Sequence, residues 1–191
     1  NRAIFTAYNQ LGQKTEVTLS AVTYYSRAGI QTTGNPTTRY QYNAYGEVVK
    51  EQVLQEGTTD IQSGSPFWAE TWRYYDKAGR MTHVVDAEGY LTTTEYNASG
   101  DVVRAVEYAR AVAQRNAPAY TPGMPILSNY TGSLNLSSTT IPPTAPAAGD
   151  AATGFDREKT WSYDVLGRKL SETVVRNYRA TDNSFSRQNL V

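Results

Sequence analysis

The side chains that could do chemistry are few in this sequence, and the first is its single histidine, His83. A lone imidazole is able to act as a general base or a metal ligand, because it changes charge near neutral pH. The absence of cysteine excludes disulfides, cysteine-based zinc sites and a cysteine nucleophile, and no Gly-x-Ser-x-Gly sequence supplies a serine nucleophile. We interpret His83 as a packing or surface residue of a strand, and expect no catalytic residue, no metal site and no cofactor.

Two aspartates, Asp76 and Asp164, are the second candidate, since paired carboxylates can serve as general acid and base. Each lies in the phrase Tyr-[Asp/Asn]-x-x-Gly, and other copies of the phrase carry Asn9, Asn43 or Asn97 at the same position. An amide caps a turn as a carboxylate does, but it cannot transfer protons. The recurrence therefore favours turn capping over catalysis.

Basic and aromatic side chains near the turns are candidates for binding. Arg80 and Arg168 follow the turn glycines and could hold an anion, although Gln, Glu or Asp fills this position in other copies; we favour a cross-strand charge pair. Three tryptophans could stack on sugars, namely Trp68, Trp72 and Trp161. Aromatic residues at strand spacing beside a turn usually pack in an interior, and carbohydrate stacking stays open as the alternative.

The repeated phrase has the chemistry of a hairpin turn. An Asp or Asn at its start accepts a hydrogen bond from the backbone two residues on, and the Gly takes a positive φ without a Cβ clash. The Tyr ends the incoming strand, where its ring suits cross-strand packing. The full copies are Tyr8, Asn9 and Gly12; Tyr42, Asn43 and Gly46; Tyr75, Asp76 and Gly79; Tyr96, Asn97 and Gly100; and Tyr163, Asp164 and Gly167.

A degenerate sixth copy is present at Tyr25–Gly29, with Ser in place of the acid or amide. The segment Asp86–Gly89 is expected to be a turn of a second type. Alternation of side chains on either side of Asn97–Gly100 predicts strands there. The sequence thus predicts an all-β fold, with antiparallel β-hairpin repeats forming one curved sheet strip.

Residues 1–191 are expected to form one strip fragment of a larger protein, with three departures from the repeat. Gly, Ser and Pro indicate a loop excursion at 51–69. An Ala-rich stretch predicts a short helix at 107–116. Residues 118–154 are rich in Pro, Ser and Thr, which indicates a long irregular insertion.

The charge balance excludes some partners. Lys plus Arg is 18 and Asp plus Glu is 18, which gives a formal net charge of zero. A general nucleic-acid or anionic-membrane surface needs a basic field, so neither partner is expected. No apolar run approaches the ~20 residues of a transmembrane helix, and no charged-then-apolar leader opens the sequence. Asn1 is not a start residue, so we interpret the sequence as a piece of a longer polypeptide.

Two copies of the phrase carry a family resemblance. Residues 75–81 (YDKAGRM) and 163–170 (YDVLGRKL) resemble the YD repeat, Tyr-Asp-x-x-Gly-Arg-Leu, of bacterial Rhs proteins, of the B and C components of Tc toxin complexes and of teneurins. The resemblance covers about residues 5–108 and 158–176; other copies replace Asp by Asn and Arg by Gln, Glu or Asp. It implies a β-strip that spirals into a hollow shell able to enclose a toxic C-terminal effector. The Asp-Pro sequence of the family's self-cleavage is absent.

Our hypothesis from the sequence is a non-enzymatic wall segment of a secreted or cell-surface bacterial Rhs/YD-repeat protein. Its expected partners are the rest of its own polypeptide or neighbouring repeats, and an encapsulated toxin domain. The alternative is an extracellular carbohydrate-binding or adhesion module that uses the tryptophans.

Overall fold

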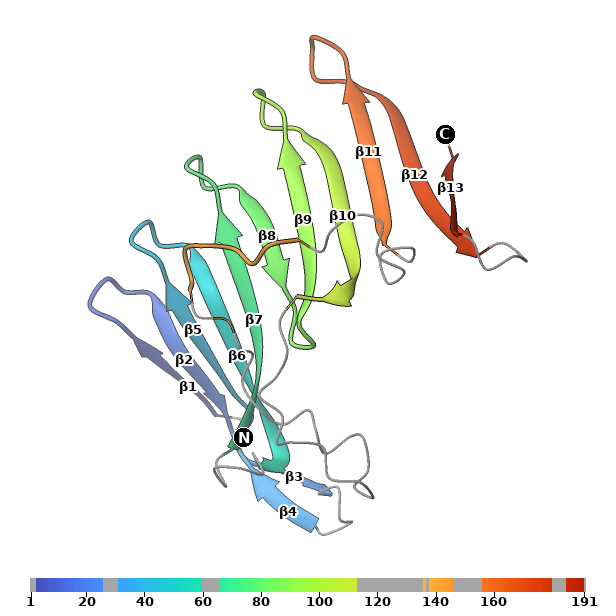
Figure 1. Ribbon diagram of the computed structural model, residues 1–191. Helices are drawn as coiled ribbons and strands as arrows, with labels where there is room; N and C mark the ends of the chain where they lie inside the picture. The colour runs from blue at the N-terminus through green and yellow to red at the C-terminus, as the bar shows by residue number, and fades with distance from the viewer. Residues whose placement is uncertain are drawn as a thin grey trace. The chain divides into compact units, whose positions relative to one another are not determined.

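The computed structural model describes residues 3–25, 31–59, 66–112, 136, 138–145, 156–179 and 185–190. The chain divides into two units, which are described separately below. The first consists of Asn1–Arg73 and Gln114–Thr139, and the second of Tyr74–Ala113 and Thr140–Val191. Every regular element in the described residues is a β-strand (Figure 1).

The first unit is built on an antiparallel sheet with the strand order β1-β2-β5-β6-β7. A second, two-stranded sheet pairs β3 with β4. The strands are β1 (Ile4–Tyr8), β2 (Lys14–Leu19), β3 (Val22–Tyr25), β4 (Gln31–Gly34), β5 (Thr37–Tyr42), β6 (Val48–Thr59) and β7 (Pro66–Tyr75), of which the last two residues belong to the second unit.

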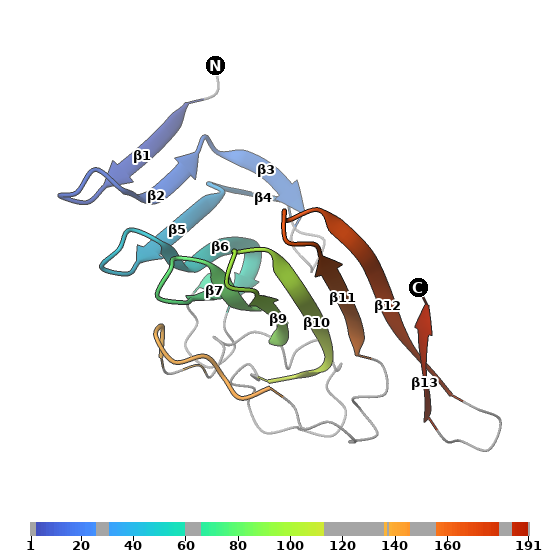
Figure 2. The same ribbon diagram turned by 90° about the horizontal axis from the view of Figure 1, so that it is seen from above.

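The second unit has the strand order β8-β9-β10-β11-β12-β13, again antiparallel. Its strands are β8 (Met81–Val85), β9 (Tyr90–Tyr96), β10 (Val102–Ala111), β11 (Arg157–Tyr163), β12 (Lys169–Arg179) and β13 (Phe185–Leu190). In Figures 1 and 2 the strands from β9 to β12 lie side by side in this order. The turns 97–100 and 164–167 lie at one end of these strands, and the turn 86–89 lies at the other.

Five buried residues of the second unit share one face of the sheet, because residues that are Cα partners in an antiparallel pair project to the same side. Val85 is the partner of Leu91, Thr93 is the partner of Val106, and Val106 and Val175 are both partners of Glu158. All five named apolar and Thr side chains are buried, and Val85 and Leu91 are fully so. A sheet that buries one face and wets the other suits the alternating sequence of these strands.

The first unit buries a more polar set. Val49, Trp72 and Glu70 are its buried residues among those described. Trp68, Glu70 and Trp72 alternate along β7 and therefore share a face, which they form together with Leu54, Gln52 and Lys50 of β6.

The all-β antiparallel prediction is confirmed, and the described residues contain no helix. Accordingly, no helix long and apolar enough to cross a membrane is found in this part of the chain. The predicted helix at 107–116 is wrong for residues 107–111, which continue β10. Glu107 is a Cα partner of both Thr92 in β9 and Arg157 in β11, and these non-local ladders override the helical propensity of alanine.

The loop excursion predicted at 51–69 is wrong over most of its length. Residues 51–59 belong to β6 and residues 66–69 to β7, and the two strands pair from Lys50–Trp72 to Thr59–Pro66. Residues 60–65 lie outside the described part of the chain, as do the degenerate copy beyond Tyr25 and most of 118–154. Within the latter, residues 138–145 are described and have no helix or strand.

Candidate functional site

The turns share one hydrogen-bond pattern, illustrated by Asp76–Gly79. The Gly79 N–H donates to the Asp76 carbonyl at 3.1 Å, and the Asp76 N–H donates to the Arg80 carbonyl at 2.9 Å. The Asp76 Oδ1 accepts from the N–H groups of Ala78 and Arg80 at 2.8 and 3.0 Å. The glycine has φ +78°, the left-handed region that a side chain disfavours. The same backbone pairs close the turns that begin at Asn9, Asn43, Asn97 and Asp164.

The Asp86–Gly89 turn also follows this pattern, so its expected assignment to a second turn type is wrong. Gly89 has φ +91° and its N–H donates to the Asp86 carbonyl at 3.0 Å. The Asp86 Oδ1 accepts from the N–H groups of Glu88 and Tyr90, both at 2.9 Å. The turn lacks the preceding tyrosine, which explains why the repeated phrase did not identify it; Asp and Gly three residues apart were the only signal.

The residue after each glycine is matched to the residue that opens the turn. The Arg80 Nε donates to the Asp76 Oδ2 at 2.7 Å, and the Arg168 Nε donates to the Asp164 Oδ2 at 2.6 Å. These charge pairs span the turn from its first residue to the residue after its glycine. Where an amide opens the turn, the later residue offers an acceptor: the Asn97 Nδ2 donates to the Asp101 Oδ2 at 2.9 Å. Gln13 and Glu47 accept from Asn9 and Asn43 in the same way.

This chemistry lowers the pKa of both turn aspartates. The backbone N–H of Arg80 is the main cause for Asp76, followed by the Arg80 guanidinium, and Arg168 acts likewise on Asp164. A carboxylate held ionised by two backbone N–H groups and an arginine is a poor general acid. The geometry thus accounts for these residues without a catalytic role.

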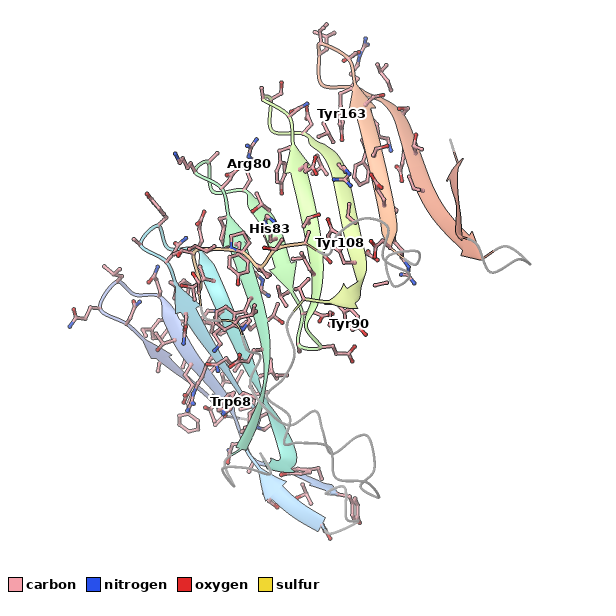
Figure 3. The ribbon with its side chains drawn as sticks, in the orientation of Figure 1. Trp68, Arg80, His83, Tyr90, Tyr108 and Tyr163 are labelled. Carbon is pink, nitrogen blue, oxygen red and sulfur yellow. The ribbon has the colours of Figure 1, made fainter. Side chains whose placement is uncertain are left out.

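The tyrosines that precede three of the turns bind the preceding hairpin. The Tyr42 hydroxyl donates to the Lys14 carbonyl at 2.8 Å, that of Tyr96 to the Met81 carbonyl at 2.9 Å, and that of Tyr163 to the Val102 carbonyl at 3.0 Å. Figure 3 shows Tyr163 where β11 approaches its turn. Each acceptor is the residue two positions after a turn glycine, at the start of an outgoing strand. We call this contact the tyrosine bridge.

The tyrosine bridge lies where the backbone ladder stops. The ladder between β2 and β5 comprises only Glu16–Thr18 with Thr37–Arg39, and that between β10 and β11 begins at Arg104. The first carbonyls of the outgoing strands, at Lys14 and Val102, therefore lack a ladder partner on that side. The phenol is long enough to reach them, and it replaces a backbone donor with a side-chain donor.

A second contact joins neighbouring turns through Arg80. Its Nη1 donates to the Asn97 carbonyl at 3.1 Å, and its guanidinium carbon lies 4.8 Å from the centre of the Tyr96 ring. Arg80 thus combines an ion pair in its own turn with a cation–π contact to the next one.

The two tryptophans of β7 in the first unit each contact a cation of another strand, Arg39 of β5 and Lys50 of the neighbouring β6. The Arg39 guanidinium lies 4.3 Å from the Trp68 ring centre, and the Lys50 ammonium lies 4.6 Å from that of Trp72. Trp72 is only 6% exposed, so it has no open ring face on which a sugar could stack. Trp68, labelled in Figure 3, keeps one ring face covered by Arg39.

Glu70 is the most buried charge in the described residues, with 3% of its side chain exposed. Its Oε1 accepts from the Lys50 Nζ and the Gln52 Nε2, both at 2.8 Å, and its Oε2 accepts from the Trp72 Nε1 at 3.2 Å. Sequence reasoning missed this cluster, because the register that brings β6 onto β7 is not visible in the phrase itself.

Trp161 and Arg104 of the second unit lie beside carboxylates of adjacent strands. Trp161 is the Cα partner of Glu172. Lys169 is the main cause that lowers the pKa of Glu172, followed by Trp161. Arg104 joins Glu95 and Glu158 across three strands at 2.6 and 2.7 Å.

His83 packs within the second unit. Its ring makes an edge contact with Tyr74 at 6.4 Å between centres, and its Nδ1 lies 3.0 Å from the Thr82 hydroxyl. Burial lowers the pKa of His83, which favours the neutral imidazole. No group of three His, Cys, Asp or Glu residues suited to a metal ion occurs in the described ranges.

Sequence reasoning also missed the tyrosine bridge. One signal could have found it: every full copy and the degenerate one carry Tyr and never Phe, although the chain contains four Phe residues. Phe could replace Tyr if only the packing of the ring mattered, but Phe has no hydroxyl to donate a hydrogen bond.

Together, the shared turn and the tyrosine bridge define a protein built from β-hairpin repeats, in which Tyr42, Tyr96 and Tyr163 each bind the outgoing strand of the preceding hairpin. Residues 75–111 match the family model described as RHS Repeat, which confirms the resemblance that the YD phrases indicated. The comparison with curated protein sequences gave no match.

Among solved structures, the chain is similar to the crystal structure of TcdB2–TccC3 without its hypervariable C-terminal region, with 11% identity and a TM-score of 0.41 over 98% of this chain and 9% of that one. It is also similar to TcdB2–TccC3–TEV (13% identity, TM-score 0.36, covering 92% and 9%). A third is the Photorhabdus luminescens Tc holotoxin pore with a mutated TccC3 (11%, TM-score 0.34, covering 98% and 10%). The chain spans about a tenth of these structures, and similarity at these values does not extend to function.

Proposed function

We propose that the chain is a non-enzymatic wall segment of a secreted bacterial RHS-repeat protein, and that this wall encloses a toxin domain of the same complex. The observation that carries the proposal is the tyrosine bridge, which joins hairpins to their neighbours within the sheet of each unit. Side-chain contacts that join neighbouring hairpins suit an extended β-sheet wall better than a compact enzyme.

The use of the polar residues supports the same role. The turn carboxylates are bound by backbone N–H groups and arginine, Glu70 is bound by three donors, and Arg104 joins two carboxylates. Each of these groups stabilises a turn or joins neighbouring strands. The match of residues 75–111 to the RHS repeat, and the resemblance of the YD phrases to those of Tc toxin components, support a toxin domain as the enclosed partner.

The test uses the full-length protein from which this sequence comes, with its flanking domains. Limited proteolysis should leave an enclosed domain intact while the wall is folded, and should degrade that domain once the wall is unfolded. The variant Tyr42→Phe, which removes a tyrosine bridge, should increase degradation of the enclosed domain. Its matched control is Tyr45→Phe, because Tyr45 is 90% exposed at a turn tip.

Two results would refute the proposal. One is a full-length particle with a filled core and no internal cavity in an electron-microscopy map. The other is equal proteolysis of every domain under native conditions, with no difference between the native chain and its unfolded form.

A further inference from the structure

Three side chains with the chemistry of an amide cross-link meet on β6 and β7 of the first unit. Lys50 carries a primary amine, Gln52 a carboxamide and Glu70 a carboxylate. The Glu70 Oε1 accepts from the Lys50 Nζ and from the Gln52 Nε2, both at 2.8 Å. The amine and the carboxamide therefore lie within two hydrogen-bond lengths of each other, joined through one carboxylate oxygen.

The strand register assembles this cluster. Lys50 and Gln52 are two residues apart in β6, so their side chains project to the same side of the sheet. Gln52 is the Cα partner of Glu70, and Lys50 is the Cα partner of Trp72, in the antiparallel pair of β6 and β7 (Figure 1). The carboxylate thus reaches both side chains of β6 from the adjacent strand.

The cluster is shielded from water. Glu70 has 3% of its side chain exposed and Lys50 has 14%. Trp72 is 6% exposed, its ring centre lies 4.6 Å from the Lys50 Nζ, and its Nε1 donates to the Glu70 Oε2 at 3.2 Å. Desolvation is one of the ways in which a lysine amine becomes a nucleophile, and a water-excluding site also slows hydrolysis of a product.

We propose that Lys50 and Gln52 form an intramolecular amide bond, with Glu70 as the catalytic residue. The Glu70 carboxylate takes a proton from the Lys50 ammonium, and the free amine attacks the Gln52 Cδ. The Nζ–Cδ bond forms and the Cδ–Nε2 bond breaks. Glu70 relays two protons, one after the other, from Nζ to Nε2, so that one ammonium ion leaves and Glu70 is a carboxylate again.

The atoms and charges of this step balance without an oxidant, a metal or another reactant. The ammonium and the carboxylate start as an ion pair, and the ammonium ion that leaves carries the positive charge away. The ion pair seen in the structure is the state before the bond forms. Proximity favours the reaction, because the three groups are already held together by the fold.

Gln52 is favoured over Glu70 as the partner of the amine. An ionised carboxylate resists attack by an amine, whereas a carboxamide is neutral. A bond from Lys50 to Glu70 would also consume the group that relays the protons, and within the described residues no second carboxylate contacts the Lys50 amine.

The bond would hold β6 in its extended conformation. An extended backbone places side chains two residues apart on one face, and this placement is the condition for closing the ring. The cross-link therefore keeps residues 50–52 in the geometry that pairs with β7. The proposal goes beyond the wall role and holds whether or not the wall encloses a cargo.

The test is a tryptic digest of the full-length protein from which this sequence comes, analysed by mass spectrometry after denaturation. Arg39, Lys50 and Arg73 are successive cleavage sites, so a chain without the bond gives the peptides 40–50 and 51–73. A cross-linked Lys50 is not cleaved. Residues 40–73 should therefore appear as one peptide, with a mass lower by one ammonia, and fragmentation should place the link between Lys50 and Gln52.

Two results for the native sequence would overturn the proposal. One is complete cleavage into the peptides 40–50 and 51–73, with no peptide of the reduced mass. The other is a peptide lighter by one water and linked at Glu70, because this would make Glu70 the partner of the amine and not the catalyst. Both results are read from the native protein, so they do not depend on the folding of a variant.

Variants separate the roles of the three residues. Gln52→Ala should abolish the link, and Glu70→Gln, which keeps the size of the side chain but cannot relay protons, should slow its formation roughly a hundredfold. The matched control is Gln41→Ala, because Gln41 is the Cα partner of Lys50 on the opposite neighbour, β5, and should leave the link intact. An unchanged rate in Glu70→Gln, or loss of the link in Gln41→Ala, would refute the assigned roles.

Discussion

Removing one hydroxyl from a tyrosine bridge should destabilise the protein by a defined amount. Tyr163→Phe keeps the ring and deletes only the donor that lies 3.0 Å from the Val102 carbonyl. A neutral hydrogen bond contributes about 1 kcal/mol net, and the carbonyl left behind has no ladder partner on that side to replace it. For a chain of this size, a loss of that amount lowers the melting temperature by about 2–4 °C.

The assay is chemical denaturation followed by tryptophan fluorescence, with thermal melting as a second measurement. Tyr42→Phe and Tyr96→Phe should give losses similar to that of Tyr163→Phe, since their bridges have the same geometry. Tyr45→Phe is the control and should change the stability by less than about 0.5 kcal/mol, as exposed substitutions do.

The double variant Tyr42→Phe/Tyr163→Phe tests independence. The two bridges share no partner, so the losses should add to about 2 kcal/mol. If the three bridge variants lose no more unfolding free energy than Tyr45→Phe, the hydroxyls contribute nothing to stability and the tyrosine bridge does not hold the hairpins together.

Three other perturbations test the turns and the buried charge. The pKa of Asp76 is lowered in the fold, so its ion pair with Arg80 should stabilise the protein fully above the pKa of a free aspartate and lose that effect as the pH falls through the lowered pKa. Asp76→Asn should therefore make the stability less dependent on acid pH in unfolding curves measured at several pH values. An unchanged pH dependence would contradict this prediction. Glu70→Ala removes the carboxylate that pairs with the Lys50 ammonium, whose side chain is only 14% exposed. This variant should lower the free energy of unfolding in urea by about 3–5 kcal/mol. Glu70→Gln should lower it less, and equal losses of unfolding free energy in the two variants would contradict a charge effect. Gly100→Ala meets no atom within 4 Å but keeps φ +97°, so backbone strain alone should cost about 1 kcal/mol, with Gly100→Asn milder; a neutral Ala variant would contradict the strain argument.

The carbohydrate alternative has a direct consequence for the tryptophans. Trp72 is buried beneath the Lys50 ammonium, and Trp68 lies against the Arg39 guanidinium. These contacts join β7 to β6 and to β5 in the first unit, and Trp72 has no open ring face for stacking.

The sequence by itself determined the local chemistry of the chain. Asp or Asn followed three residues later by Gly specifies a turn through its own side chain and a left-handed backbone, and these interactions are complete within five consecutive residues. The all-β class followed from the same repeat, and so did the position of each turn that begins at Asn9, Asn43, Asp76, Asn97 or Asp164.

Only the tertiary structure decided how the hairpins are joined. Residues 107–111 became strand because β9 and β11 pair with both edges of β10, and no property of an Ala-rich stretch records those ladders. The tyrosine bridge and the buried Glu70 also depend on register between strands, which sets the distance from a hydroxyl or carboxylate to its partner. Turn formation is a local equilibrium within one short segment, whereas strand pairing brings distant residues together, and only the second creates these contacts.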